Sequence, residues 1–163
     1  MRNIIFTSLA AILLAGSGWA GGPPPGCYHR DYTDAHLRKH PKQIVDWITM
    51  IVERDQYGQD VARMMVFTAN QGHVQNSGQG HQVFTQYLFC FDEAGGKARC
   101  AVECDGGGFV VTRDTGKSLT FQTKNLWVGE TDECGGAVDL AEIPGKPVKY
   151  RLDRVSDSAC DGL

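Results

Sequence analysis

The stretch VFTQYLFCFDEAGGKARCAVEC, residues 83–104, indicates how this chain folds. Residues 83–91 are rich in aromatic and β-branched side chains, which favour strands. The turn Ala94-Gly95-Gly96 follows, and in residues 98–104 Cys100, Val102 and Cys104 then alternate with polar or small neighbours. The stretch therefore predicts an antiparallel β-hairpin, whose second strand has one buried and one wet face.

The cysteines of this hairpin predict a first disulfide. If the loop holds three residues, Cys90 and Cys100 face each other at a separation that a disulfide spans. A bridge from Cys100 to Cys104 is excluded, because residues four apart on a strand are about 13 Å apart. An even number of cysteines in an exported chain is typical of a disulfide framework, whereas a four-thiolate zinc site needs closely paired cysteines. The predicted pairs are Cys90–Cys100, Cys104–Cys134 and Cys27–Cys160.

The rest of the chain shows the same pattern of strand-like runs separated by glycine turns. Strands are predicted over residues 44–52, 61–68, 118–123 and 148–155, with tight glycine turns between most of them. Short links make sequential strands antiparallel neighbours, since a parallel crossover needs a dozen or more residues. We therefore predict an all-β fold: an antiparallel meander of about eight strands that closes into a small barrel or a strongly curled sheet, which hides its edges. A two-sheet sandwich is the alternative.

The N-terminal region differs in composition. Residues 21–31 begin with a Gly/Pro-rich segment and are predicted to be an extended tether. A short helix is expected through residues 35–39, capped by Thr33 or Asp34 and ended by Pro41. Residues 32–163 then form a single β domain, in which Asn70 to Gly80 is expected to be an irregular surface loop.

Residues 1–20 have the layout of a secretory signal peptide. Arg2 precedes an apolar run from Ile4 to Ala15, and small residues follow at Gly18 and Ala20. A membrane anchor is disfavoured, because about 20 apolar residues are needed to span a bilayer. We therefore expect cleavage after Ala20, a location in the periplasm or outside the cell, and no stable membrane anchor.

The charge balance bears on the class of partner. Arg2 is the only charged residue of the first twenty, so 15 basic and 19 acidic residues follow it, a net charge of −4. Nucleic acids and anionic membranes select for clustered Lys and Arg. The sequence shows no basic stripe, so we expect no nucleic-acid partner.

The histidines offer a candidate metal site. His36 and His40 are four residues apart, so a helix places both on one side, as metal ligands are often placed, and His29 is a candidate third ligand. Leu37 stands where a zinc protease has its glutamate, so that chemistry is excluded. The alternative is that both imidazoles are simply solvated.

The sequence lacks the features expected of an enzyme. The Asp105-Gly106-Gly107-Gly108 turn fits neither phosphate-binding pattern, and it is followed by residues of strand type. There is no G-x-S-x-G elbow, and the acid pairs Glu103/Asp105 and Asp132/Glu133 are commonplace in turns. No catalytic residue and no cofactor is predicted.

Binding is the remaining class of function. A barrel of about eight strands can hold one small apolar ligand or present a surface to an envelope protein. Aromatic side chains are available for such a site, although they can equally fill the core: Trp47, Phe84, Tyr87, Phe121, Trp127 and Tyr150. The predicted function is an exported, non-enzymatic binding or interaction module. The alternatives are a metal-handling protein that uses His36 and His40, and an inhibitor of an envelope enzyme.

Two segments resemble a known group of sequences. Cys100-Ala-Val-Glu-Cys104-Asp-Gly-Gly and Thr131-Asp-Glu-Cys134-Gly-Gly are similar to segments of an uncharacterised family of exported bacterial proteins. The resemblance implies export. No activity is known for that family, so it assigns no functional residue.

Overall fold

A computed structural model describes residues 22–93, 95–129, 131 and 136–163. Its strands are β1 (Gly26–Asp31), β2 (Val45–Arg54), β3 (Asp60–Thr68), β4 (Val83–Glu93), β5 (Lys97–Ala101), β6 (Gly107–Asp114), β7 (Ser118–Val128), β8 (Val138–Asp139) and β9 (Val148–Arg154). The helices are α1 (Asp34–Lys39), α2 (Gly72–Asn76) and the 3-10 helix η1 (Asp157–Cys160).

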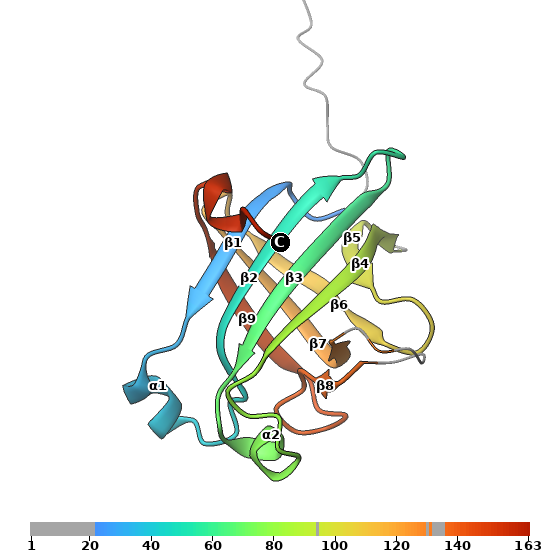
Figure 1. Ribbon diagram of the computed structural model, residues 1–163. Helices are drawn as coiled ribbons and strands as arrows, with labels where there is room; N and C mark the ends of the chain where they lie inside the picture. Colours follow the sequence, from blue (N-terminus) through green and yellow to red (C-terminus); the bar gives the residue numbers. More distant parts are fainter. Residues whose placement is uncertain (1–21, 94, 130, 132–135) are drawn as a thin grey trace, which may run out of the picture.

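The strands form a closed antiparallel barrel (Figure 1). Strands β1 to β7 each pair with the next in sequence, and β9 completes the ring between β7 and β1. The short strand β8 lies outside this ring and pairs only with the end of β7. The predicted all-β barrel is therefore confirmed, and the sandwich alternative is wrong.

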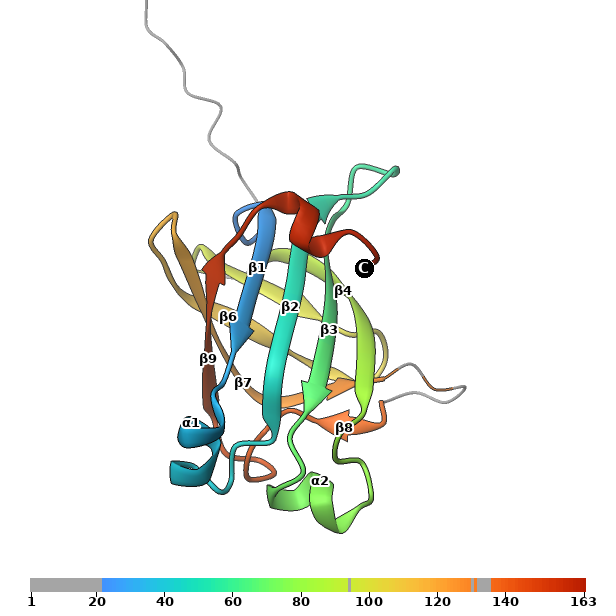
Figure 2. The ribbon, with the colours of Figure 1, turned by 60° about the vertical axis from the view of Figure 1, so that its left-hand side comes forward.

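Two predicted disulfides are confirmed. Glu93 pairs with Lys97 across the β4–β5 hairpin, which leaves a three-residue loop and puts Cys90 opposite Cys100. These two cysteines are bridged, with their Cα atoms 4.0 Å apart. Cys27 is bridged to Cys160, which ties β1 to η1 (Figure 2). The third predicted pair, Cys104 with Cys134, stays a prediction because Cys134 lies outside the described residues.

The prediction of a tether over residues 21–31 is wrong for its second half. Gly26 to Asp31 form strand β1, which pairs with β2 along its whole length and with β9 through Tyr28 and His29. Tyr28 points into the barrel and is 1% exposed. The sequence did not predict this strand, because the Gly/Pro-rich segment before it is typical of a tether and its second partner, β9, comes from the other end of the chain.

Both short helices lie at one end of the barrel. Helix α1 confirms the prediction: the Thr33 hydroxyl accepts a hydrogen bond from the His36 amide, and the helix ends just before Pro41. Helix α2 corrects the expectation of an irregular loop over residues 70–80. Val74 is its buried residue, and the Gln71 side-chain amide before it donates to the carbonyl oxygens of His40 and Gln43 at 2.8 and 2.6 Å.

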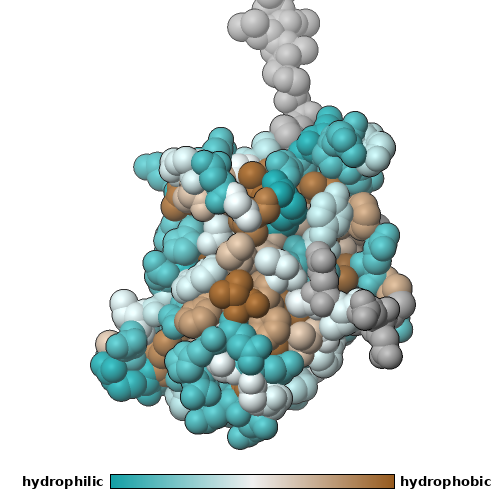
Figure 3. Space-filling model, in the orientation of Figure 1, coloured by the Kyte–Doolittle hydropathy of each residue, from teal (hydrophilic) through white to brown (hydrophobic). Residues whose placement is uncertain are grey.

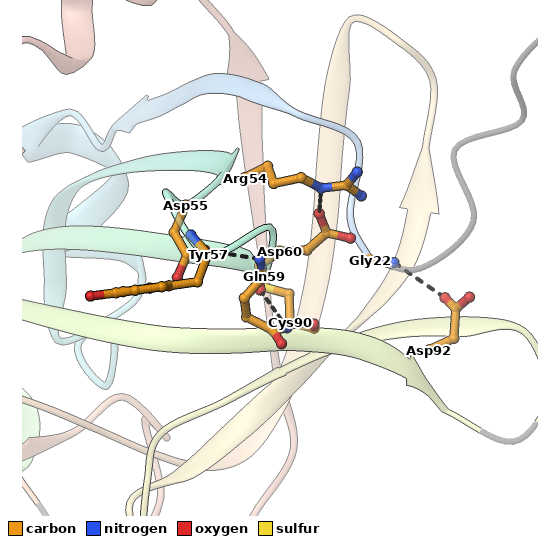
Figure 4. Close-up of polar contacts among 8 residues, drawn as sticks. All are labelled: Gly22, Arg54, Asp55, Tyr57, Gln59, Asp60, Cys90 and Asp92. Carbon is orange, nitrogen blue, oxygen red and sulfur yellow. Dashed lines mark hydrogen bonds and ion pairs between the residues drawn. The ribbon is translucent and has the colours of Figure 1, made fainter.

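A polar cluster lies at the opposite end of the barrel, around the β2–β3 turn (Figure 4). The Asp55 carboxylate accepts hydrogen bonds from the amides of Tyr57 and Gln59 and so shapes the β2–β3 turn. The Gln59 side chain then donates across to the Cys90 carbonyl oxygen at 3.0 Å. Asp60, nearly buried, is held by Arg54 at 2.9 Å. These contacts join β2, β3 and β4 and have a structural role.

Candidate interaction surfaces

The interior of the barrel is filled by side chains from its strands. Met50, Met64, Leu88, Phe109 and Phe121 are each at most 1% exposed and belong to one packed cluster. Tyr150 is also buried there; its ring lies 5.4 Å from that of Phe121, and its hydroxyl donates to the Leu140 carbonyl oxygen at 2.8 Å. Burial raises the pKa of this phenol well above its ordinary value. Small barrels of this size are commonly packed in this way.

The six aromatic residues named from the sequence do not share one site. Phe121 and Tyr150 are core residues, and Phe84 packs against the core. Trp127 lies beside β8 next to a shallow hollow of about 250 Å³ that also includes His73 and Pro144. Trp47 and Tyr87 are on the outside of the barrel. Sequence alternation alone could not separate these groups, because both faces of several strands are apolar.

The outer face of β2, β3 and β4 carries several apolar and aromatic side chains. Here Trp47, Phe67 and Val83 form one cross-strand row, and Ile51, Arg63 and Tyr87 form another. Alternate residues on the same strands, such as Ile48, Met64 and Leu88, are fully buried inside. We call this surface the aromatic face and define it by Trp47, Ile51, Met65, Phe67, Val83, Tyr87 and Phe89.

Ring contacts organise the aromatic face. The rings of Trp47 and Phe67 stack at 5.8 Å, and those of Tyr87 and Phe89 meet edge to face at 5.3 Å. The hydropathic surface in Figure 3 is apolar over the middle of β2 and β3 and polar around it. In the centre, the Arg63 guanidinium is held by Glu53 at 2.7 Å and also donates to the Leu163 carbonyl oxygen. A hollow of about 210 Å³ lies between this tail residue, Thr85 and Tyr87.

Asp46 lies next to Trp47, at the edge of the aromatic face. Partial burial raises the pKa of its carboxyl above the ordinary value of 3.8, and the neighbouring Asp34 and Asp31 raise it further, while His81 opposes them. A raised carboxyl pKa means that ionised Asp46 destabilises the folded state. That cost is present above the folded-state pKa and disappears once the pH falls below 3.8, because both states are then protonated.

We therefore expect Asp46→Asn to stabilise the protein at pH 7. The gain should be less than about 1 kcal/mol, since the group is only partly buried and solvent screens it. It should shrink as the pH is lowered from 6 towards about 4. Urea unfolding of the variant and the parent at each pH measures the difference, with the exposed Asp161→Asn as the control. A gain that is the same at every pH would contradict this account.

The candidate metal ligands are only partly brought together. His36 and His40 stack with ring centroids 4.2 Å apart, and Tyr32 packs on His36 at 4.9 Å. His29 is engaged elsewhere: its Nδ1 is 2.8 Å from the Thr49 hydroxyl and its Nε2 is 3.1 Å from Asp31. In the described part of the chain, no group of three or more His, Cys, Asp or Glu side chains is arranged to hold a metal ion. A site on His36 and His40 stays a prediction.

The acid pairs also remain without a site. Glu103 and Asp105 are exposed in the turn between β5 and β6, and Asp132 and Glu133 lie outside the described residues. The strand expected to run to Cys104 ends at Ala101. The glycines at residues 106–108, where β6 begins, allow β6 to lie close to β5. A side chain on Gly108 would lie 2.3 Å from the Cys100 carbonyl oxygen.

The fold and its surfaces define a disulfide-bonded, eight-stranded antiparallel barrel with a filled interior. Comparison of the chain with protein families, with curated proteins and with solved structures finds no match. None of the helices in the described residues is long and apolar enough to cross a membrane. The two disulfides suggest a location outside the cytoplasm.

Proposed function

We propose that this protein is an exported, non-enzymatic interaction module that binds a partner protein through the aromatic face. The observation that carries the proposal is the row of Trp47, Phe67 and Val83 on the outside of a barrel whose interior is already packed. Val83 is 51% exposed although it is apolar. Contiguous apolar patches on the surface of a soluble fold mark interaction sites.

The chemistry of the face favours a protein over a small ligand. Small-molecule sites are concave and bury most of the ligand, whereas this surface is the outside of a barrel. Trp, Tyr, Phe, Met and Arg are the residue types enriched at the centres of protein interfaces. Trp47, Tyr87, Phe67, Met65 and Arg63 supply one of each. We infer a partner that presents an apolar patch of its own.

Export is the second part of the proposal. It is supported by the signal-peptide pattern of residues 1–20 and by the confirmed Cys27–Cys160 and Cys90–Cys100 bridges, since disulfides persist in oxidising compartments. An inhibitor of an envelope enzyme is one form that such a module can take. The partner would then be the enzyme, and the aromatic face would be the surface that contacts it.

Site-specific photo-crosslinking in exporting cells tests the aromatic face. A photoreactive residue at Met65, in the centre of the face, should give one discrete protein adduct, and the same residue at the exposed Thr112 on β6 should not. The double substitution Trp47→Thr with Phe67→Thr should lower the adduct yield about tenfold or more, because large aromatic side chains contribute most to interface binding. The folded state should survive, because both side chains lie outside the core.

The outcomes are distinguishable. A melting temperature close to that of the parent shows that the double variant is folded, and the cell fraction that contains the adduct reports on export. No adduct at Met65, or the same adduct at Thr112, contradicts the proposed face. An adduct of twice the chain mass contradicts a distinct partner protein and assigns the face to self-association.

A further inference from the structure

A second outer surface, on the side of the barrel away from the aromatic face, has the opposite chemistry. Figure 1 shows β6 and β7 behind β2 and β3. Phe109, Phe121 and Tyr150 point inward, so the residues beside them on β6, β7 and β9 face outward. Basic residues gather on this surface: Lys97 and Arg99 on β5, Arg113 on β6, Lys117 in the turn, Lys124 on β7, and Lys149 and Arg151 on β9.

These residues surround two hollows that lie end to end. The first, of about 300 Å³, is lined by Arg113, Lys117, Arg151 and hydroxyl-bearing residues that include Thr120. The second, of about 450 Å³, is lined by Lys97, Arg99, Lys124 and by Thr112, Gln122 and Asn125, among others. Thr120 and Gln122 are successive outward positions of β7, and Thr112 and Arg113 are adjacent on β6. We call the two hollows together the basic groove.

The basic groove follows β7 from Ser118 to Asn125, which at the usual rise per residue is about 23 Å. The register shows how cations flank this strand. Arg113 and Arg151 lie on either side of Thr120, and Lys149 lies opposite Gln122. The groove is therefore long and narrow, and its cations are spread along its length.

Most of the charge in the groove is not neutralised by the protein. Arg99 is paired with Glu93 at 3.0 Å, and Arg151 with Asp153 at 2.9 Å. Lys97, Arg113, Lys117, Lys124 and Lys149 make no ion pair within the described residues. At physiological salt, charges are screened beyond about 8 Å, so the local cations rather than the net charge of the chain decide what this surface attracts.

This surface corrects the sequence-based conclusion that there is no basic stripe. The cations come from four strands and one turn, so no run of them exists along the chain. Phe109, Phe121 and Tyr150 take the inner face, so alternation puts the cations on the outer face, and a bulge between Val111 and Arg113 brings Arg113 to the same side. The barrel then places those faces side by side.

We propose that the basic groove binds an acidic polysaccharide in extended form along β7. The cations would meet its carboxylate or sulfate groups, and the side chains of Thr112, Thr120, Gln122 and Asn125 would hydrogen-bond its hydroxyl groups. The Thr120 hydroxyl is available, since no hydrogen bond engages it within the described residues. The site is separate from the aromatic face, and the proposal does not depend on the proposed function.

The lining of the groove disfavours the other polyanions. Proteins that hold single-stranded nucleic acid stack its bases on aromatic side chains, and no aromatic residue lines either hollow in the described residues. Peripheral binding to an anionic membrane combines basic residues with apolar side chains that enter the interface. Val110 is the only large apolar residue among those lining the two hollows.

Binding measurements on the full, oxidised chain test this inference. Fluorescein-labelled heparin and polygalacturonate serve as sulfated and carboxylated probes, and dextran, oligothymidylate and phosphatidylglycerol vesicles are the comparison ligands. At about 50 mM salt we expect binding to at least one acidic glycan and none to dextran. The affinity should fall markedly at about 200 mM salt, because cations that bind a polyanion release its counterions.

Matched variants locate the site. Arg113→Gln with Arg151→Gln should lower the affinity about tenfold or more, and Lys97→Gln with Lys124→Gln should do the same from the second hollow. The control Arg38→Gln with Lys42→Gln removes the same charge from exposed positions outside the groove and should leave the affinity within about twofold. Unchanged melting temperatures confirm that the variants are folded, and the second pair serves if the first does not fold.

The remaining outcomes would overturn the proposal. If neither acidic glycan binds at low salt, the groove is not a site for such polymers. If the control pair loses as much affinity as the groove pairs, the binding is non-specific. If oligothymidylate or the vesicles bind more tightly than both acidic glycans, the partner belongs to one of those classes instead.

Discussion

Removing the Cys27–Cys160 bridge should lower the free energy of unfolding by about 2–5 kcal/mol. The two cysteines are 133 residues apart, so the bridge closes a loop that comprises most of the described chain. A cross-link stabilises mainly by restricting the unfolded chain, and in that account the effect grows with the logarithm of the loop length. Cys27 also holds β1, which the barrel needs in order to close on β9.

The matched comparison is the Cys90–Cys100 bridge. Its cysteines are 10 residues apart, so its loop-closure contribution should be about 2 kcal/mol smaller. Urea unfolding of Cys27→Ala/Cys160→Ala and of Cys90→Ala/Cys100→Ala, beside the parent with and without reductant, measures both contributions. All four cysteines are buried, so the alanine changes cost similar packing. Equal losses for the two pairs, or a reduced parent as stable as the oxidised one, would refute the cross-link account.

Gly107→Ala should be strongly destabilising, with a loss of about 3–5 kcal/mol in the free energy of unfolding. Gly107 has φ +71°, and a Cβ atom there would lie 2.0 Å from the backbone carbonyl oxygen of Asn125. The clashing atom belongs to the backbone of Asn125, so rotation of a side chain cannot relieve the contact. Gly107 pairs with Leu126 where β6 meets β7, so the clash would disturb one of the pairings that make up the ring.

Gly116→Ala is the control for backbone strain alone. Gly116 has φ +73°, but no atom lies within 4 Å of its added Cβ. It should therefore lose only about 1–2 kcal/mol, the cost of a left-handed conformation. Thermal unfolding and near-ultraviolet circular dichroism would follow both variants. Similar losses at Gly107 and Gly116 would show that the contact with Asn125 is unimportant and that conformation accounts for the effect.

The two outer surfaces differ in how far local sequence could predict them. Trp47, Phe67 and Val83 each belong to runs that are apolar at consecutive positions, so a two-faced strand was evident, but not which face was inside. The basic groove was not predicted, because the side on which Arg99, Arg113 and Arg151 lie depends on the strand register and on the bulge before Arg113.

The candidate histidines also show what local sequence could predict and what it could not. The cap at Thr33 and the stop at Pro41 correctly predicted a helix, and the rings of His36 and His40 stack at its end. The position of His29 could not be predicted in this way. It depends on β1 pairing with β2, which places the imidazole against Thr49 rather than beside the helix.

Local sequence determined the all-β class, the three-residue hairpin at Glu93–Lys97 and the disulfide between Cys90 and Cys100, because alternation, glycine turns and short links act over a few residues. Tertiary structure alone decided that Gly26–Asp31 is a strand, that β9 closes the ring, and which side chains share a surface. The physical reason is that residues distant in sequence meet only after the chain has folded. Their common surface then depends on the strand register, which no short stretch of the chain specifies.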